Sequence, residues 1–307
     1  MSYAFKDLHW SKGIEVKEYL LPNSLADALD NLEKYQGRAQ VIAGGTDVVP
    51  QLRHRDLEVD ALVDITRLPD MDRIEEEGDM IQLGGLVTHA QVASSLLIRE
   101  KGGILAEGAR SLGSPQIRSI ATVAGNLISA HPAADTAIPL LALNASVVVS
   151  SKEGSRAIPL ADLFSNNGAA TLDSRKDILT HIRFPSVRKD QGGCHLRLSK
   201  RRSITIAVLI FAAVVKVDKV GQVIKEATVA LGPVAPKPFR AVKTETLLKG
   251  ASINMDTIEK AANAAFEESQ PISDAVWGSE EYKREMVRVL TRRGLKKALE
   301  RAGTPIT

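Results

Sequence analysis

The chain has 307 residues, a hydrophobic content of 44% and a formal net charge of +3. A disordered chain would carry fewer apolar residues, so these values favour a folded protein of about two domains. The mild positive charge is compatible with an anionic ligand or an acidic partner. The aromatic content of 4% argues against a protein that stacks single-stranded bases, and we expect no nucleic-acid partner.

Cysteine usage and apolar runs bear on the cellular location. Cys194 is the only cysteine, so it can neither form an internal disulfide nor hold an iron–sulfur cluster alone. The N-terminus lacks the basic start and apolar run of a secretory signal. The longest apolar stretch, residues 204–217, is too short to span a bilayer and is interpreted as a buried strand. We therefore expect a cytoplasmic protein with no membrane span.

The first half of the chain alternates short apolar strands with amphipathic helices. Strands are predicted over residues 16–21, 39–43, 61–65, 80–86 and 178–184. Helices are predicted over residues 24–36, 47–52 and 88–97, with a further one ending near residue 111. Ser24 with Asp27, and Thr88 with Gln91, have the spacing of helix-capping pairs. The stretch 112–135 carries few charges and many turn residues, and is expected to be a long functional loop.

Composition changes after Pro185. A polar linker at residues 189–193 precedes the buried strand at 204–217, a strand at 227–231 and a proline-rich turn. Helices are predicted over residues 240–249, 256–268 and 282–301, the last of them basic. Both halves are therefore expected to be α+β, with a boundary between residues 188 and 189.

Two segments rich in small residues are the candidates for ligand binding. In the first, residues 41–47 (VIAGGTD), two glycines after a strand let the backbone approach a ligand closely. Successive amides there suit an anion such as a pyrophosphate, and an ordinary glycine turn is an equal alternative. The motifs G-x-G-x-x-G and G-x-x-x-x-G-K-S/T are absent, so a nucleotide would need another fold.

The second segment spans residues 121–127 (ATVAGNL) and continues at residues 131–135 (HPAAD). Its small residues would let a large planar ligand lie against the backbone. Asn126 can both donate and accept hydrogen bonds, and Asp135 can accept them from hydroxyl groups. A plain loop of turn residues is the alternative interpretation.

Taken together, the two segments resemble the FAD-binding subunits of the molybdenum hydroxylases, the family of the carbon monoxide dehydrogenase and xanthine dehydrogenase flavoproteins. The family motif A-G-G-T-D-L is matched by residues 43–48, and T-x-G-G-N with S-P-x-x-D by residues 122–126 and 132–135. Further matches are residues 177–179, 184–185, 231–236 and 240. The resemblance implies an α+β fold. A two-subdomain FAD-binding domain of the vanillyl-alcohol-oxidase/PCMH type would cover residues 1–188, with subdomains of about 1–65 and 66–188. A smaller C-terminal domain of the CO dehydrogenase flavoprotein type would cover residues 189–307.

The resemblance also implies individual roles. The residues that would wrap the FAD pyrophosphate are Val41, Ile42, Ala43, Gly44, Gly45, Thr46, Asp47 and Val48. Those that would line the flavin and its phosphates are Thr122, Gly125 and Asn126, with Ile178 and Leu179 against the ring system. Asp135 would hold ribose or ribityl hydroxyls, and Leu112 would lie near the adenine. Arg197 stands where family members often carry Lys near the isoalloxazine.

Three positions depart from the family pattern. Ala124 replaces the first glycine of a pair, so the backbone there must accept a methyl group. His131 replaces the usual Ser before Pro132. Arg197 keeps the charge of the usual Lys but not its compact ammonium group, so the flavin would be tuned differently.

Other polar residues point to no separate chemistry. The histidines His9, His54, His89, His131, His181 and His195 are scattered without metal-ligand spacing, so no metal is assigned to this chain. The nucleophile motif G-x-S-x-G is absent, and no catalytic residue is assigned. For the basic run at residues 197–202, contact with flavin or a partner is expected at least as strongly as a solvated face. Cys194 is expected to be inert.

The resemblance implies an oxidoreductase subunit that transfers electrons. Partner subunits, an iron–sulfur small subunit and a molybdopterin large subunit, would form a heterotrimer or a dimer of heterotrimers with it. Electrons would come from their [2Fe-2S] clusters and leave for NAD⁺, a quinone, a carrier protein or dioxygen. Two alternatives stay open: a self-sufficient FAD-dependent oxidase of a small alcohol or sugar, which the few aromatic residues disfavour, and a non-catalytic interaction module. The single cysteine excludes the branch of the family that carries an inserted [4Fe-4S] cluster.

Overall fold

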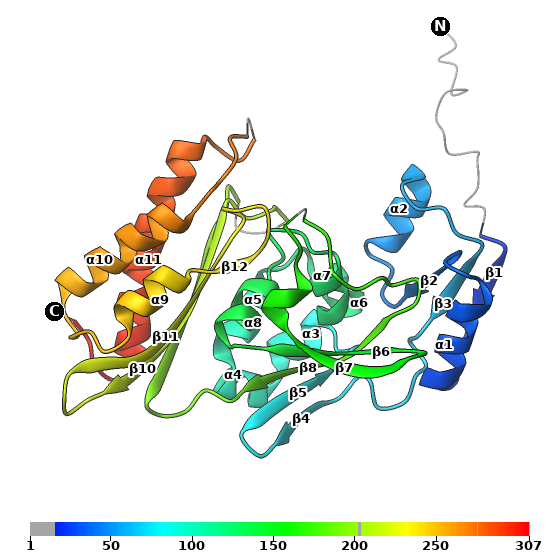
Figure 1. Ribbon diagram of the computed structural model, residues 1–307, viewed down its shortest axis with the longest axis horizontal. Helices are drawn as coiled ribbons and strands as arrows, with labels where there is room; N and C mark the ends of the chain where they lie inside the picture. Colours follow the sequence, from blue (N-terminus) through cyan, green and yellow to red (C-terminus); the bar gives the residue numbers. More distant parts are fainter. Residues whose placement is uncertain (1–15, 167, 202–203, 275, 307) are drawn as a thin grey trace, which may run out of the picture.

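The computed structural model describes residues 16–166, 168–201, 204–274 and 276–306. His9 and the end of the basic run at Arg202 lie outside these ranges. The described residues form three sheets that follow one another along the long axis of the molecule (Figure 1). The N-terminal sheet lies at one end and the C-terminal sheet at the other, so the middle sheet and its helices contact both.

The N-terminal sheet is parallel, in the order β1 (Glu18–Leu20), β3 (Ala61–Asp64), β2 (Ala39–Ile42). Parallel strands need a crossover connection, and α1 (Leu25–Lys34) supplies it between the two edge strands β1 and β2. Ser24 Oγ accepts a hydrogen bond from Asp27 N at 3.1 Å, but the Asp27 carboxylate accepts from Asn23 N. The predicted capping pair is therefore half formed. α2 (Val48–His54) follows β2 directly after the glycine pair.

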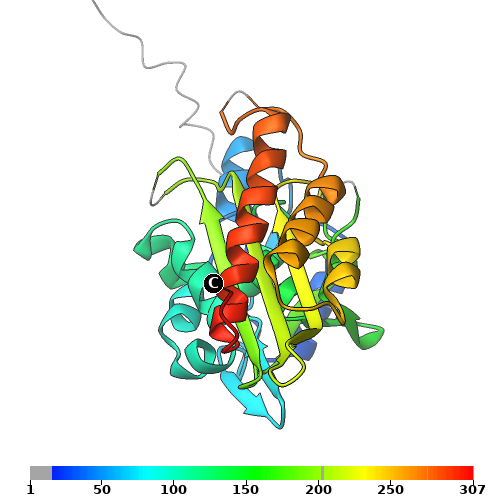
Figure 2. The ribbon, with the colours of Figure 1, turned by 90° about the vertical axis from the view of Figure 1, so that its left-hand side faces the viewer.

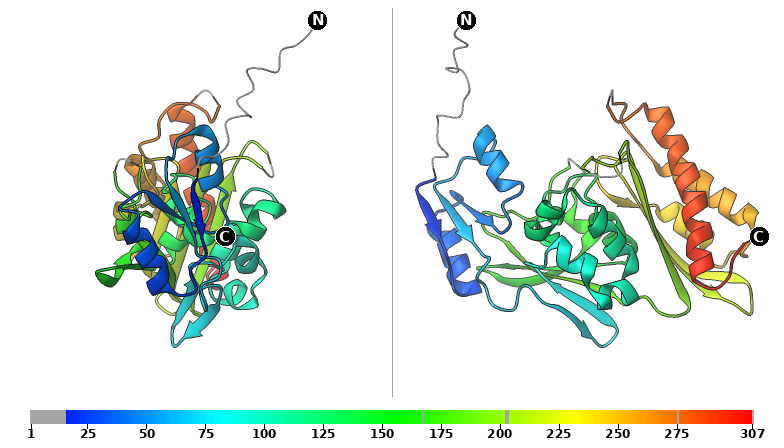
Figure 3. Two further views of the ribbon diagram at one scale, coloured as in Figure 1. Left: turned by 90° about the vertical axis from the view of Figure 1, so that its right-hand side faces the viewer. Right: turned by 180° about the vertical axis from the view of Figure 1, so that it is seen from behind.

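The middle sheet is antiparallel. Its strands, in order, are β4 (Ile74–Glu77), β5 (Met80–Gly84), β8 (Ile178–Pro185), β6 (Ser146–Ser151) and β7 (Gly154–Pro159). The helices that accompany it are α3 (His89–Ser94), α4 (Leu96–Lys101), α5 (Gly103–Ser111), α6 (Pro115–Ile120), α7 (Val123–Ile128), α8 (Ala137–Ala142) and the 3-10 helix η3 (Leu160–Leu163). Seen from behind, α3 to α5 gather between this sheet and the C-terminal sheet (Figure 3).

The C-terminal sheet is also antiparallel, in the order β12 (Phe239–Arg240), β11 (Val223–Gly232), β10 (Leu209–Asp218), β9 (Gln191–Leu198). Its outer face is covered by α9 (Val242–Leu248), α10 (Met255–Glu268) and α11 (Glu280–Arg301), as Figure 2 shows. Its inner face packs against α5 and α8. Strand β10 is therefore buried on both sides. Ile210, Ala212 and Val214 belong to the core of the middle sheet, and the alternate residues Phe211 and Val215 belong to the core beneath α9–α11.

Four local predictions differ from the structure. Residues 112–135 are not one loop, because Ser114 and Thr122 each cap a short helix, α6 and α7. The predicted helix 88–97 is broken at Ser95, whose extended backbone ends α3 and whose hydroxyl caps α4.

The other two differences lie around β9 and β10. The linker 189–193 is shorter than predicted, because Gly192 and Gly193 already belong to β9. A Cβ on Gly192 would come within 2.0 Å of the Ala298 carbonyl oxygen, so this glycine serves close packing. The buried strand begins at Leu209 and not at Ile204, which has a positive φ of 50° and is exposed.

Among the described helices, none combines the length and the apolar character needed to cross a bilayer.

Packing between α11 and β10 generates a first prediction. Gly294 lies against the ring of Phe211, and a Cβ there would stand 2.1 Å from a ring carbon. Gly294→Ala should lower the free energy of unfolding by about 1–3 kcal/mol, because overpacking outweighs the gain in helix propensity. Urea denaturation followed by circular dichroism measures the change. The neighbouring exposed Arg293→Ala is the control and should change stability by less than about 0.5 kcal/mol. Equal stability of Gly294→Ala and wild type would contradict the packing argument.

Candidate cofactor-binding site

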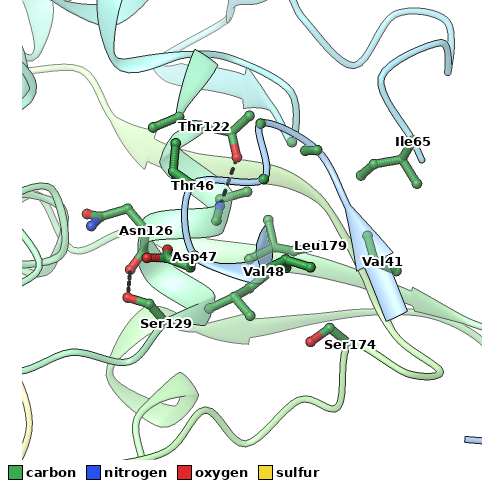
Figure 4. A pocket seen from close by; sticks show the side chains of 18 of the residues that line it. Val41, Thr46, Asp47, Val48, Ile65, Thr122, Asn126, Ser129, Ser174 and Leu179 are labelled. Atoms are coloured by element: carbon green, nitrogen blue, oxygen red, sulfur yellow. Dashed lines mark hydrogen bonds between the residues drawn. The ribbon is translucent and has the colours of Figure 1, made fainter. Parts of the chain in front are cut away.

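A cavity of about 430 Å³ lies between the N-terminal sheet and helices α6 and α7. This volume is in the usual range of small-molecule sites. Figure 4 shows Thr46 and Asp47 beside Thr122 and Asn126. The two small-residue segments, about 75 residues apart in sequence, thus share one cavity. The predicted residues that line it are Val41, Ala43, Gly44, Gly45, Thr46, Asp47, Val48, Leu112, Thr122, Gly125, Asn126, Ile178 and Leu179.

The two segments meet at Gly44. A Cβ on Gly44 would stand 1.9 Å from the backbone oxygen of Ile120, at the end of α6, so only glycine allows this approach. The next residue, Gly45, has a φ of +68°, which L side chains rarely adopt. The first glycine therefore brings the two backbones together, and the second turns the chain into α2.

The loop after β2 offers backbone hydrogen-bond donors but no cationic side chain. Within the described chain, the backbone N–H groups of Gly45, Thr46 and Asp47 donate to no other residue. No Lys or Arg is among the described residues that line the cavity. Asp47 is exposed at the cavity mouth, yet surrounding atoms desolvate its carboxyl and raise its pKa, an effect that the nearby His131 opposes. An anionic ligand would therefore be held by backbone dipoles and not by cationic side chains.

The wall formed by α7 is held by side-chain hydrogen bonds. Thr122 caps the helix, and its Oγ1 accepts from Gly125 N at 3.0 Å. Asn126 Oδ1 accepts two hydrogen bonds, from Thr136 N at 3.2 Å and from Thr136 Oγ1 at 2.6 Å. The positions of Thr122 and Asn126 are thus fixed by the chain itself.

The departures Ala124 and His131 are accommodated. The Ala124 methyl group is buried in the core of the middle sheet, on the side of α7 away from solvent. His131 Nδ1 accepts a hydrogen bond from Ala133 N at 3.1 Å, so the imidazole closes the turn before α8. A serine hydroxyl could close the same kind of turn.

Three predicted site residues do not line the cavity. The side chain of Ile42 is buried in a small core with Leu52 and Leu62. Asp135 and Arg197 bind each other: Arg197 Nε donates to Asp135 Oδ1 at 2.8 Å, and both side chains are largely buried where β9 meets the middle helices. Burial raises the pKa of the Asp135 carboxyl, and the guanidinium of Arg197 opposes the rise.

The sequence reasoning missed several residues that line the cavity. They are Gln40, Gln51, Ile65, Gly85, His89, Ile117, Ile128, Ser129 and Ser174. Ala121, Ala124 and Asp177 also line the cavity; they lie in the quoted motifs but were given no binding role. His89 is the least expected, since it is fully buried and neither ring nitrogen has a hydrogen-bond partner of good geometry in the described chain. No sequence pattern marked it, because its place in the cavity follows from the bridge between Thr88 and Thr122, which are distant in sequence. Among the described residues, no group of three or more His, Cys, Asp and Glu side chains could hold a metal ion.

Comparison with known proteins identifies the family. Residues 13–187 match the model of the FAD-binding domain in molybdopterin dehydrogenase, and residues 195–298 match that of the CO dehydrogenase flavoprotein C-terminal domain. The chain belongs to the FAD-binding medium subunits of the molybdenum hydroxylase family. It is 31% identical to the glyceraldehyde dehydrogenase medium chain of Sulfolobus acidocaldarius, over 91% of this chain and 96% of that one. It is 29% identical to the xanthine dehydrogenase FAD-binding subunit of Escherichia coli O157:H7, over 91% and 95%.

The solved structures agree with this assignment. The carbon monoxide dehydrogenase of Hydrogenophaga pseudoflava contains a chain that superposes with a TM-score of 0.88 at 26% identity, covering 93% of this chain and 98% of that one. The fold predicted from the resemblance, an FAD-binding domain followed by an α+β C-terminal domain, is therefore confirmed.

The cavity of this medium subunit suits FAD. Its volume and the close backbone approach at Gly44 leave room for a diphosphate. The backbone N–H groups of Gly45, Thr46 and Asp47, which donate to no other described residue, can bind it. Ile178 and Leu179 give the cavity an apolar wall. The cavity therefore suits a ligand that has a charged diphosphate between two flat ring systems.

The contact at Gly44 generates a second prediction. Gly44→Ala places a methyl group against the Ile120 carbonyl and must push the two segments apart. We expect the dissociation constant for FAD, measured by flavin fluorescence, to rise at least about tenfold, which corresponds to about 1.4 kcal/mol. Gly103→Ala is a matched control, because a Cβ there meets nothing within 4 Å and the position opens α5. Unchanged FAD affinity in Gly44→Ala would show that the contact does not shape the site.

Buried histidines generate a third prediction. Desolvation lowers the pKa of His89 to about 4, although the Thr122 backbone raises it slightly. Desolvation likewise lowers the pKa of His195 to about 4. Between this value and the unfolded value of about 6.5, the unfolded state binds the proton and the folded state does not. The free energy of unfolding should therefore fall as pH drops from about 6.5 to 4, by up to about 1.4 kcal/mol per pH unit for each histidine.

Denaturation at a series of pH values tests this. His89→Leu should show a shallower loss of stability below pH 6.5 than wild type, while the two slopes coincide above about pH 7.5, where histidine is neutral in both states. Parallel slopes below pH 6.5 would mean that His89 is protonated in the folded protein.

Proposed function

We propose that this chain is the electron-transfer subunit of a multi-subunit molybdenum hydroxylase. It would receive electrons from the [2Fe-2S] clusters of an iron–sulfur small subunit and deliver them to an external acceptor such as NAD⁺, a quinone, a carrier protein or dioxygen. A large subunit would hold the molybdopterin cofactor, in a heterotrimer or a dimer of heterotrimers. The supporting observation is the single cavity shared by the two FAD-family segments.

FAD, when bound, supplies the capacity to take up and release electrons one or two at a time. The chain binds and orients it. We propose that the amides of Gly45, Thr46 and Asp47 hold its pyrophosphate and that Gly44 permits the close approach. The other lining residues would surround the rest of the molecule: Thr122, Gly125 and Asn126 from α7, with Leu112, Ile178 and Leu179 as apolar contacts.

For Asp135 and Arg197 we propose an indirect role. The pair joins the segment after α7 to β9, and the Arg197 guanidinium also donates to the Thr205 carbonyl before β10. It would therefore hold the C-terminal sheet and the approach to β10 in place beside the site. This electron-transfer role needs no general acid or base in the chain. We also propose a cytoplasmic location, which suits a buried free thiol at Cys194.

The decisive experiment uses the purified chain with FAD and a reduced iron–sulfur subunit under anaerobic conditions. The flavin absorbance should bleach when the cluster subunit is added. It should not bleach when small alcohols or sugars are added to the chain alone. Bleaching by such a substrate would favour a self-sufficient oxidase. Failure to bind FAD, tested by thermal shift, would favour a non-catalytic interaction module and contradict the proposal.

A further inference from the structure

Thr136 makes an unusual use of its hydroxyl group. It occupies the N-cap position of α8, where a threonine normally accepts a hydrogen bond from its own helix, yet its side chain makes no capping bond. The hydroxyl instead donates to Asn126 Oδ1 at 2.6 Å, and the Thr136 backbone N–H donates to the same oxygen at 3.2 Å. Thr136 is fully buried and does not line the cavity, whereas Asn126 is half-buried and does.

These two bonds determine which way the Asn126 amide faces. The oxygen and nitrogen of an asparagine side chain are often interchangeable by geometry alone. Here they are not, because a backbone N–H can only donate and must face the amide oxygen. The oxygen therefore points to the interior, toward Thr136. The Asn126 NH₂ group has no partner within the described chain, and Asn126 lines the cavity.

A hydrogen-bond donor with a fixed direction, such as the Asn126 NH₂ group, is important for binding in this cavity. No Lys or Arg is among its described lining residues, and the ionisable lining residues other than His89 are the carboxylates Asp47 and Asp177. Burial keeps His89 uncharged near neutral pH. The oxygens of a phosphate or of a flavin would therefore depend on neutral N–H and O–H donors for their hydrogen bonds.

We propose that Thr136 is a positioning residue that locks the Asn126 amide with its NH₂ group toward the cavity, as a dedicated donor to an acceptor oxygen of FAD. The proposal rests on the proposed FAD-binding role of Asn126 and adds the residue that gives it a direction. The proposal also predicts that a carboxylate cannot replace the amide of Asn126. In Asn126→Asp, one oxygen would accept the Thr136 bonds and the other would turn a negative charge toward the acceptor oxygen of the cofactor.

The test measures the FAD dissociation constant of the full chain by fluorescence, with thermal stability measured in the absence of FAD. Thr136→Val keeps the shape and the backbone N–H but removes the hydroxyl, and it should raise the constant about three- to tenfold, the range of one neutral hydrogen bond. Thr136→Ser keeps the hydroxyl and should stay within about twofold of wild type. Thr291→Val is the matched control: Thr291 is fully buried like Thr136, but its hydroxyl has no partner in the described chain.

A double-mutant cycle separates positioning from a general effect on the fold. In an Asn126→Ala background there is no amide to orient, so Thr136→Val should have no further effect on FAD affinity. An equal loss of affinity in both backgrounds would overturn the proposal, as would an unchanged constant for Thr136→Val alone.

Should Thr136→Val fail to fold, comparison of Asn126→Asp with Asn126→Ala decides the question. The aspartate variant must bind FAD more weakly than the alanine variant, by about tenfold or more, because it opposes an acceptor with a charge. Equal or tighter binding by the aspartate variant would overturn the proposal. Failure of the wild-type chain to bind FAD would instead contradict the proposed function itself.

Discussion

The backbone of Gly44 rests against the carbonyl group of Ile120, and the shape of the candidate cofactor site depends on this contact. It joins the loop after β2 to the end of α6, two parts of the chain that are distant in sequence. Once they touch, the amides of the first segment and the polar side chains of α7 face one volume. The tightness of the contact explains why a glycine must stand there, since the space for even one methyl group is taken by backbone.

Much of the fold and about half of the site could be predicted from the sequence. Strands such as β2, β3 and β8 are short apolar runs bounded by turn residues, and α10 and α11 have a clear helical period, so local patterns sufficed. The lining residues from Ala43 to Val48 and from Thr122 to Asn126 lie in two compact motifs, which a family resemblance can locate. In both cases the information is contained in a few consecutive residues.

The remainder depends on pairs of residues that are distant in sequence. Asp135 was expected to hold ribose or ribityl hydroxyls and Arg197 to lie near the isoalloxazine. In the structure the two largely buried groups pair with each other, a contact between distant residues that no local pattern reveals. His89 lines the cavity because Thr88 pairs with Thr122 across two segments, a contact that no periodicity reveals. The short helices α6 and α7 were missed because six residues are too few for a helical period, and only their capping residues mark them.

Strand β10 has a consequence for the modularity of the chain. Two family models divide the sequence, one ending at residue 187 and the other starting at residue 195, as though two parts could be exchanged freely. Yet alternate side chains of β10 complete two different cores, and Ile210, Ala212 and Val214 fill the one that α5 and α8 help to form. Separating the parts would leave an apolar surface on each side of the cut. Any recombination between relatives must therefore match side-chain volumes on both faces of this strand.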